Sequence, residues 1–505
     1  MVGWNRCALS TFVRARHYYT LYSTRGHASK GAKDPMRIPF STERQANGYL
    51  RKHGLFPSRI TAPARRDLGL VVVIPCYNEP DMESVLDCLW RCARPACSVE
   101  VIVVVNASDA DDPSVHAQNR RTLIGAERWI AAMTVHGDDA LRFHVLDFPA
   151  LPARHAGVGL ARRIGMDEAV ARFAAAENPE GVIACLDADC CCDGNYLTAL
   201  VAHFRDHPKS PGCSIYFEHP LDLAETSDIR AAIAGYELHL RYYAHGLRVA
   251  GSPYAHHTVG SSMAVRTRVY EQQGGMNRRK AGEDFYFLQK IMALGGFTDL
   301  RATRVLPSPR ISTRAPFGTG RAIGDSLKQS DGARYTYAPR IFRDLQKLLS
   351  RVGGLYAMGK TGSDLVADPS VMNFSATDSV AAGLPAYVSA FLRARRFDER
   401  RIEIRRNAAS AAAFEKRFHR WFNALLTLKF IHFATEHHYP KVPVEQAARA
   451  LLRSGFRSGA RDPSDERDSS DKGCSDGVPA EEEIPEQREA LLLRYRAIDR
   501  GEGGE

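Results

Sequence analysis

The sequence predicts an α/β fold, built on a mostly parallel twisted sheet with helices on both faces. Three observations carry this prediction. Short continuous runs of β-branched residues recur between Leu70 and Leu186, and segments of helix length separate them. Such runs are typical of strands that are buried on both faces. A long stretch of helical and basic character after residue 340 predicts a C-terminal helical region beside the sheet.

The predicted strands and helices alternate along the first part of this sheet. The strands cover Leu70–Ile74, Val99–Val105, Phe143–Leu146 and Val182–Leu186. The intervening helices cover Asp81–Ala93, Asn119–Met133 and Leu160–Ala176. Ligands of such sheets bind outside the carboxyl ends of the strands. We therefore expect the functional residues directly after the predicted strands.

Charge divides the 505 residues into four predicted regions. No acid precedes Asp34, and the basic start resembles either a transit peptide or a disordered arm, which we favour. We expect a partly disordered basic extension over 1–64, the sheet domain over 65–340 and the helical region over 341–455. Residues 456–505 are rich in Ser, Gly and acids without a period, which predicts a mostly disordered acidic tail.

The cysteines and the apolar runs exclude two classes of protein. No apolar run reaches the roughly 18 residues of a membrane span. The eleven cysteines are irregularly spaced, unlike a secreted disulfide framework, so we expect reduced thiols and a cytoplasmic protein. Cys88, Cys92 and Cys97 lack a CxxC pair, and we interpret them as small buried hydrophobes rather than as zinc ligands.

The strongest motif is Asp187-Ala188-Asp189, at the end of the fourth predicted strand. Residues two apart on an extended chain project to one side. Two carboxylates at this edge can share a divalent cation with a diphosphate, and Mg²⁺ or Mn²⁺ suits such ligands. The alternative is a solvated turn before the next helix, because a DxD triplet is common by chance.

Two other motifs follow strands or open helices. Pro75-Cys76-Tyr77-Asn78-Glu79-Pro80 comes directly after the first strand, where Tyr can stack on a base and Asn or Glu can bind its edge or a ribose hydroxyl. Its alternative reading is a turn. Gly282-Glu283-Asp284 opens a helix, where an acid is either a general base or a favourable partner of the helix dipole.

These motifs together resemble the family 2 glycosyltransferases, which have the GT-A fold. IPCYNEP, LDADC and GEDFYF stand in the family's order, and the segment Gly157–Ala169 is similar to a stretch between the first two motifs. The resemblance covers about Leu70–Thr313. It implies an enzyme that moves a sugar from a nucleotide-sugar donor to a hydroxyl acceptor, generally with inversion.

The resemblance implies a role for each matching residue. Asp187 and Asp189 would hold the metal, Asp284 would be the catalytic base, and Glu283 would contact the acceptor. The chain departs from the family after strand two, where Asn106 stands in place of an acid and Asp109 comes later. The candidate residues for nucleotide-sugar binding are Pro75, Tyr77, Asn78, Glu79, Asn106, Arg162, Asp187 and Arg314.

Two loops add weaker candidates. His256 and His257 precede a loop that the family places near the acceptor, although paired loop histidines are more often solvated. Arg310 and Arg314 stand in a Pro/Gly-rich loop that could hold a diphosphate and close over the donor.

Three other functions compete with this reading. Residues 354–361 match the P-loop pattern, but an amphipathic helix rather than a strand precedes them, which disfavours an ATPase. A nucleotidyltransferase would need a basic, Gly-rich loop after the first strand. The basic segment Arg393–Lys429 would suit a nucleic-acid-binding protein, yet its aromatic residues predict a helical cap, and we expect no nucleic acid. Its arginines fit either a solvated helical face, which we slightly favour, or peripheral contact with the inner membrane face, where a lipid-linked acceptor would lie.

Overall fold

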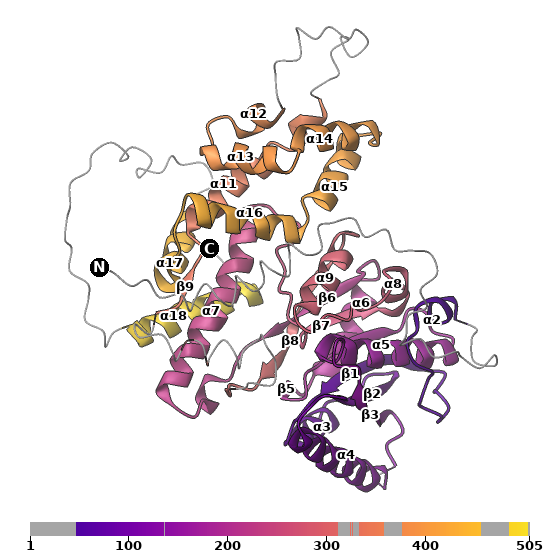
Figure 1. Cartoon of the computed structure of the whole chain (residues 1–505). Helices are drawn as coiled ribbons and strands as arrows, with labels where there is room; N and C mark the ends of the chain where they lie inside the picture. The colour runs from indigo at the N-terminus through magenta and orange to yellow at the C-terminus, as the bar shows by residue number, and fades with distance from the viewer. Residues whose placement is uncertain are drawn as a thin grey trace.

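A mixed sheet organises the first part of the chain (Figure 1). The computed structural model describes residues 47–135, 137–311, 324, 326, 333–357, 376–455 and 484–502. Within them, eight strands pair in the order β3-β2-β1-β4-β7-β6-β8-β5. Their bounds are β1 Leu68–Cys76, β2 Ser98–Ser108, β3 Leu141–Leu151, β4 Val182–Cys185, β5 Cys190–Cys192, β6 Gly212–Phe217, β7 Met263–Arg266 and β8 Thr298–Pro307.

The strand directions confirm the predicted α/β class. Strands β3, β2, β1 and β4 are parallel neighbours, with Val72 of β1 opposite Val101 of β2 and Ala184 of β4. Strand β7 is antiparallel to β4 and β6, β8 is parallel to β6, and β5 is antiparallel to β8. The carboxyl ends of β1, β2 and β4 therefore meet at one edge of the sheet.

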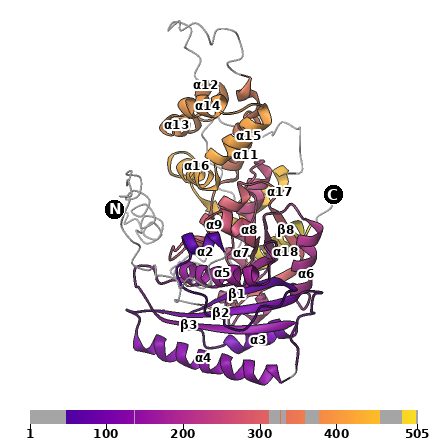
Figure 2. The ribbon, with the colours of Figure 1, turned by 90° about the vertical axis from the view of Figure 1, so that its right-hand side faces the viewer.

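Helices cover both faces because the residues of the strands alternate between two apolar cores. Val71 and Val73 of β1 pack against α5, whereas Val72 and Ile74 pack against α3 and α6. Figure 2 shows α3 and α4 on one side of β1–β3 and α5 on the other. The covering helices are α3 Met82–Trp90, α4 Pro113–Thr134, α5 Val158–Ala175, α6 Tyr196–Asp206, α8 Thr267–Gln272 and α9 Glu283–Met292.

A third apolar core holds the helical region together. It includes α7 (Ser227–Val249), which comes from the span predicted to belong to the sheet domain. The predicted boundary at residue 340 is therefore not a boundary in space. The other elements are η2 Leu221–Leu223, β9 Tyr335–Thr336, α11 Pro339–Ser350, η3 Gly353–Tyr356, α12 Ala376–Ala381, α13 Ala386–Ala394, α14 Phe397–Arg406, α15 Ala411–Trp421, α16 Ala424–His437, β10 Val442–Pro443, α17 Val444–Gly455 and α18 Ile484–Arg500.

Both predicted tails contain packed structure. From residue 47 the chain joins the sheet core: α2 (Gly48–His53) buries Tyr49, whose hydroxyl donates to Asp167 Oδ1 at 2.8 Å. The prediction of a disordered tail is wrong for α18, which packs beside α7 (Figure 1). The composition of this segment suggests disorder because acidic residues cluster in the sequence before α18. The helix itself contributes few large buried apolar side chains, among them Leu492 and Tyr495. No helix among the described residues has the length and apolarity that crossing a membrane requires.

A buried network of charges joins α18 to α7. Glu237 and Arg241, one turn apart on α7, are fully buried and pair with each other. Arg241 Nη1 lies 2.7 Å from Asp499 Oδ2, and Arg496 Nε lies 2.7 Å from Glu237 Oε1. His257 Nε2, from the loop after α7, also reaches Asp499 at 2.9 Å. Buried charges need such partners, so α18 completes the charge balance of α7.

Asp499→Ala should destabilise the protein because it leaves Arg241 and His257 without one of their buried partners. We expect a loss of about 3 kcal/mol in the free energy of unfolding, measured by urea denaturation. The matched control is Glu489→Ala on the same helix, whose ion pair with Arg230 is largely exposed and should change stability by less than about 1 kcal/mol. Equal stability of the two variants would show that α18 is not held by this network.

Candidate active site

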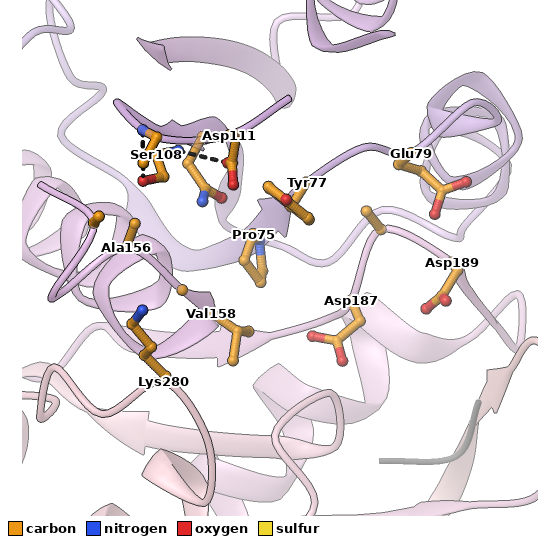
Figure 3. Close-up of a pocket in the computed structure, with 15 residues that line it drawn as sticks. Pro75, Tyr77, Glu79, Ser108, Asp111, Ala156, Val158, Asp187, Asp189 and Lys280 are labelled. Carbon is orange, nitrogen blue, oxygen red and sulfur yellow. Dashed lines mark hydrogen bonds between the residues drawn. The ribbon is translucent and has the colours of Figure 1, made fainter. Parts of the chain in front are cut away.

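One pocket of about 450 Å³ opens at the carboxyl edge of β1, β2 and β4 (Figure 3). Residues from five separate segments surround it. They are Pro75, Tyr77, Glu79, Asn106, Ser108, Ala110, Asp111, Ala153, Ala156, Gly157, Val158, Asp187, Ala188, Asp189 and Lys280. Most of the predicted nucleotide-binding residues therefore share one cavity.

The DxD turn places two carboxylates on the rim of this pocket. Strand β4 ends at Cys185, and the turn closes where the Cys190 amide donates to the Asp187 carbonyl at 3.1 Å. The Ser308 amide, beyond the end of β8, donates to the Asp189 carbonyl at 3.0 Å. The side chains of Asp187 and Asp189 keep 34% and 31% of their surface exposed, so a ligand can reach both.

Each of these carboxylates has an arginine partner. The Arg162 guanidinium, from α5, pairs with Asp187. Arg310 Nη2, which follows β8, lies 3.2 Å from Asp189 Oδ2 and also pairs with Glu79. Arg310 thus connects the DxD turn to the motif after β1. Its predicted neighbour Arg314 lies outside the described residues.

Hydrogen bonds from α4 hold the motif after β1 in place. Asn78 takes a left-handed backbone conformation with φ of 49°, which Asn tolerates better than most residues. Its amide donates to Asn119 Oδ1 at 2.8 Å, and Asn119 Nδ2 donates to the Asn106 carbonyl at 2.8 Å. Glu79 is almost fully buried, at 1% exposure. Asn119 therefore positions the ends of β1 and β2 relative to each other.

Of the acids that follow β2, Asp111 rather than Asp109 faces the pocket. Asp111 lines the pocket and accepts a hydrogen bond from the Ser108 amide at 2.7 Å. Burial first, and then the charge of Asp111, raises the pKa of the neighbouring Tyr77. Asp109 instead accepts from the Ala153 amide at 2.9 Å and does not line the pocket. The run of acids before α4 was the available signal, but it does not say which acid faces the cavity.

Lys280 is a second lining residue that the motifs did not reveal. It comes from the loop before α9, and its side chain is exposed across the pocket from Asp111 (Figure 3). The pocket otherwise carries the carboxylates of Glu79, Asp111 and the DxD turn. Lys280 therefore offers a positive charge to an anionic group in a pocket whose other charged lining residues are acids.

The start of α9 is joined to the DxD turn through Arg162. Arg162 is 3% exposed and pairs with both Glu283 and Asp187. A Cβ at Gly260 would lie 2.5 Å from Arg162 Nη1, so only glycine leaves room for the guanidinium. Glu283 is itself 3% exposed and does not line the pocket, so its contact with the acceptor stays a prediction. Arg162 does not line the pocket either, and its guanidinium is engaged by the two carboxylates.

Burial perturbs the acids at the start of α9. It raises the pKa of Glu283 to about 7, against the opposing charge of Arg162. Burial also raises the pKa of Asp284, whose Oδ1 accepts from the Phe285 amide at 2.7 Å. Asp284 remains half-buried rather than sealed, unlike Glu283. It is therefore the accessible carboxylate of the pair.

The weaker candidates are engaged elsewhere. His256 Nδ1 pairs with Asp299 at 2.7 Å, and His257 pairs with Asp499, so neither faces the pocket. Of the residues that match the P-loop pattern, Gly354–Ala357 is described. Helix α11, rather than a strand, precedes this segment, and most of the segment belongs to the short helix η3. Lys360 and Thr361 lie outside the described residues.

The DxD turn suits a hard divalent cation that brings further oxygen ligands with it. Asp187 and Asp189 supply exposed carboxylate oxygens, the donors that Mg²⁺ and Mn²⁺ prefer. Within the described part of the chain, no three His, Cys, Asp or Glu side chains form a complete metal cage. Two carboxylates plus substrate phosphates are nevertheless the usual set for Mg²⁺.

A family comparison agrees with this geometry. Residues 182–390 match the model of "Glycosyl transferase family group 2". The matched stretch contains the DxD turn and the start of α9. The resemblance that the motifs predicted is thereby confirmed over this stretch, which matches a family 2 glycosyltransferase domain. No curated protein matches the sequence.

Solved structures of other glycosyltransferases are distantly similar. TarS 1-349 of S. aureus in complex with UDP-GlcNAc has 14% identity and a TM-score of 0.36, covering 70% of this chain and 92% of its own. Mannosyltransferase PcManGT from Pyrobaculum calidifontis, in complex with GDP-Man and Mn²⁺, has 18% identity and a TM-score of 0.30, covering 80% and 91%.

The raised pKa of Glu283 predicts a pH-dependent stability. The folded protein holds this proton more tightly than the unfolded chain, so the contribution of Glu283 to stability falls as pH rises from about 4.5 to 7. Glu283→Gln removes the titration. Denaturation of both proteins at several pH values should show the wild type losing stability relative to the variant across this window. A constant difference would mean that Glu283 ionises normally.

Proposed function

We propose that this protein transfers a sugar from a nucleotide-sugar donor to a hydroxyl acceptor, with a divalent cation at the DxD turn and Asp284 as general base. One observation carries the proposal. The motif after β1, the acid after β2 and both carboxylates of the DxD turn line a single pocket. That arrangement suits a nucleoside at one end and a diphosphate at the other.

The nucleoside end is the part of the pocket near Tyr77, Asn106 and Asp111 (Figure 3). The tyrosine ring can stack on a base, while the amide and the carboxylate can bind the polar edge of a base or the ribose hydroxyls. Bound there, the nucleoside would direct its diphosphate toward Asp187 and Asp189.

The diphosphate end would hold the cation between Asp187 and Asp189. When bound, a divalent cation neutralises the charge that develops on a leaving nucleoside diphosphate. Arg310, which now pairs with Asp189 and Glu79, is also placed to bind a phosphate oxygen. Its pKa is raised, because the two carboxylates outweigh the effect of burial, so it stays a cation throughout.

Asp284 would accept the proton from the acceptor hydroxyl. The acceptor oxygen then forms a bond to the anomeric carbon, the bond from that carbon to phosphate breaks, and its electron pair leaves with the diphosphate. Attack opposite the leaving group inverts the anomeric centre. The Arg162 guanidinium acts electrostatically on both Asp187 and Asp284, which supports a base close to the proposed donor site.

The acceptor and the location of the enzyme belong to the proposal. We propose a glycan, glycolipid or cell-envelope precursor as acceptor and a cytoplasmic enzyme; all cysteines in the described residues are free thiols, which is typical of a reducing compartment. Peripheral membrane contact stays a prediction. On α14, Arg396 and Arg400 already pair with Glu399 and Glu403, which reduces the charge available to anionic lipid.

Metal-dependent donor binding is tested by titrating UDP and GDP with Mn²⁺ or with EDTA. We expect one of them to bind, more tightly with Mn²⁺, and Asp189→Ala to remove that gain and abolish turnover. Asp206→Ala, a surface carboxylate on α6, is the control that should change neither quantity. Equal affinity in Mn²⁺ and EDTA, together with a fully active Asp189→Ala variant, would overturn the metal role.

The role of Asp284 is tested by Asp284→Asn, which keeps the shape but cannot take a proton. The transfer rate should fall by about 10²–10⁴-fold, the usual share of general-base catalysis, with nucleotide affinity unchanged. Asp228→Asn, at the exposed first turn of α7, is the matched control for a helix-dipole effect. If Asp284→Asn unfolds or transfers sugar normally, Asp284 serves only as the start of α9.

A further inference from the structure

Cysteine sulfurs gather between α3 and β5. Cys192 Sγ lies 3.7 Å from Cys88 Sγ and 3.7 Å from Cys92 Sγ, and Cys191 is adjacent in β5. Cys88 lies on α3 and Cys92 lies two residues after the end of this helix, and both sulfurs contact Cys192. Cys92 and Cys192 are buried, whereas Cys88 and Cys191 are half-buried. We call Cys88, Cys92, Cys191 and Cys192 the thiol cluster.

The thiol cluster does more than fill the core. The Cys192 amide donates to Cys88 Sγ at 3.1 Å, and the Cys88 thiol can donate to the Cys192 carbonyl at 3.4 Å. Cys88 therefore contacts both the backbone and the sulfur of Cys192 in β5. The sequence predicts Cys88 and Cys92 only as small buried hydrophobes, because nothing local indicates that a distant strand brings further sulfurs to them.

The elements that carry the thiol cluster directly follow the two proposed donor-binding motifs in the sequence. Strand β5 begins at Cys190, the residue after Asp189, and α3 begins three residues after Glu79. A change in the distance between α3 and β5 is thus passed to the DxD turn and to the motif after β1. Neither Cys88 nor Cys192 lines the pocket, so the cluster is separate from the chemistry of transfer.

Cys88 is the more reactive partner. It is more exposed than Cys192. Hydrogen bonds from the Cys191 and Cys192 side chains, against the effect of burial, lower its pKa to about 3. Thiolate character and access together decide which cysteine reacts with a peroxide.

We propose that Cys88 and Cys192 are a peroxide-sensitive dithiol, whose oxidation to a disulfide ties α3 to β5. The Cys88 thiolate attacks hydrogen peroxide, gains one oxygen as a sulfenic acid and releases hydroxide, which becomes water on protonation. The Cys192 sulfur then attacks Cys88 sulfur, and a second water leaves with the oxygen and the Cys192 proton. Overall, two thiols lose two electrons and two protons, and one peroxide becomes two waters.

Closing the bond draws α3 and β5 together near the donor site. The two sulfurs approach from 3.7 Å to about 2.05 Å, and side-chain rotation and backbone shifts share that change. A misplacement of about 1 Å in a catalytic site can cost about 10²-fold in rate. The expected effect on activity rests on the proposed function. The oxidised enzyme should transfer sugar at least about tenfold more slowly, and a thiol reductant should restore the rate.

Peptide mapping under non-reducing conditions tests the disulfide itself. The full chain is treated with dilute hydrogen peroxide, alkylated and cut with trypsin, which cleaves after Arg91 and so separates Cys88 from Cys92. We expect a cross-link between the peptide that ends at Arg91 and the peptide of residues 173–205, lighter by two hydrogens than the sum of the two. Cys192→Ser should abolish it, while Cys191→Ser and Cys97→Ser, a half-buried cysteine outside the cluster, should keep it.

The outcomes separate this inference from the proposed function. The absence of the cross-link in oxidised wild type, or its survival in Cys192→Ser, would overturn the dithiol. Bound zinc in the purified protein that Cys88→Ser loses would also overturn it and make the cluster a metal site. If the cross-link forms but the reduced enzyme binds neither UDP nor GDP, the dithiol stands and the proposed function fails.

Discussion

The buried guanidinium of Arg162 is the interaction on which the candidate active site depends. It brings α5, the start of α9 and the DxD turn to one point, because Glu283 and Asp187 pair with the same cation. A buried charge is costly without a partner, so none of these groups can move away alone. Gly260 is part of the same arrangement, because a side chain there would displace the guanidinium. The site is therefore held by charge balance as much as by apolar packing.

Two other groups of ion pairs also balance charges between distant segments. Glu237 and Arg241 of α7 are balanced by Arg496 and Asp499 of α18, which attaches the end of the described chain to the middle of it. On the pocket rim, Arg310 balances Glu79 and Asp189. The Arg310 contacts differ because Arg310 and Asp189 are partly exposed, so a cation or a diphosphate can replace one partner. Buried pairs define the frame, and the exposed pair is the part that a ligand can rearrange.

The pocket chemistry agrees with the family match. A pocket rich in carboxylates does not favour a diphosphate by itself, so a cation or the side chains of Lys280 and Arg310 must supply positive charge. The match over residues 182–390 begins at β4 and includes the DxD turn and Asp284. The nucleoside end of the pocket lies before that stretch, on β1 and β2. Under the proposed function, the residues that would select the donor's base therefore lie outside the matched segment.

The sequence by itself determined the α/β class, the strands from β1 to β4 and the position of the DxD turn. These follow from local signals, because β-branched runs mark buried strands and polar motifs directly after them must lie at one edge of a parallel sheet. Only the tertiary structure decided that Asp111 faces the pocket, that Glu283 is sealed against Arg162 and that α18 packs on α7. Each of these depends on a partner far away in the chain, as does the meeting of Cys88 with Cys192. Periodicity and turn chemistry act over a few residues, whereas the pairing of buried charges and thiols is settled only when distant elements pack together.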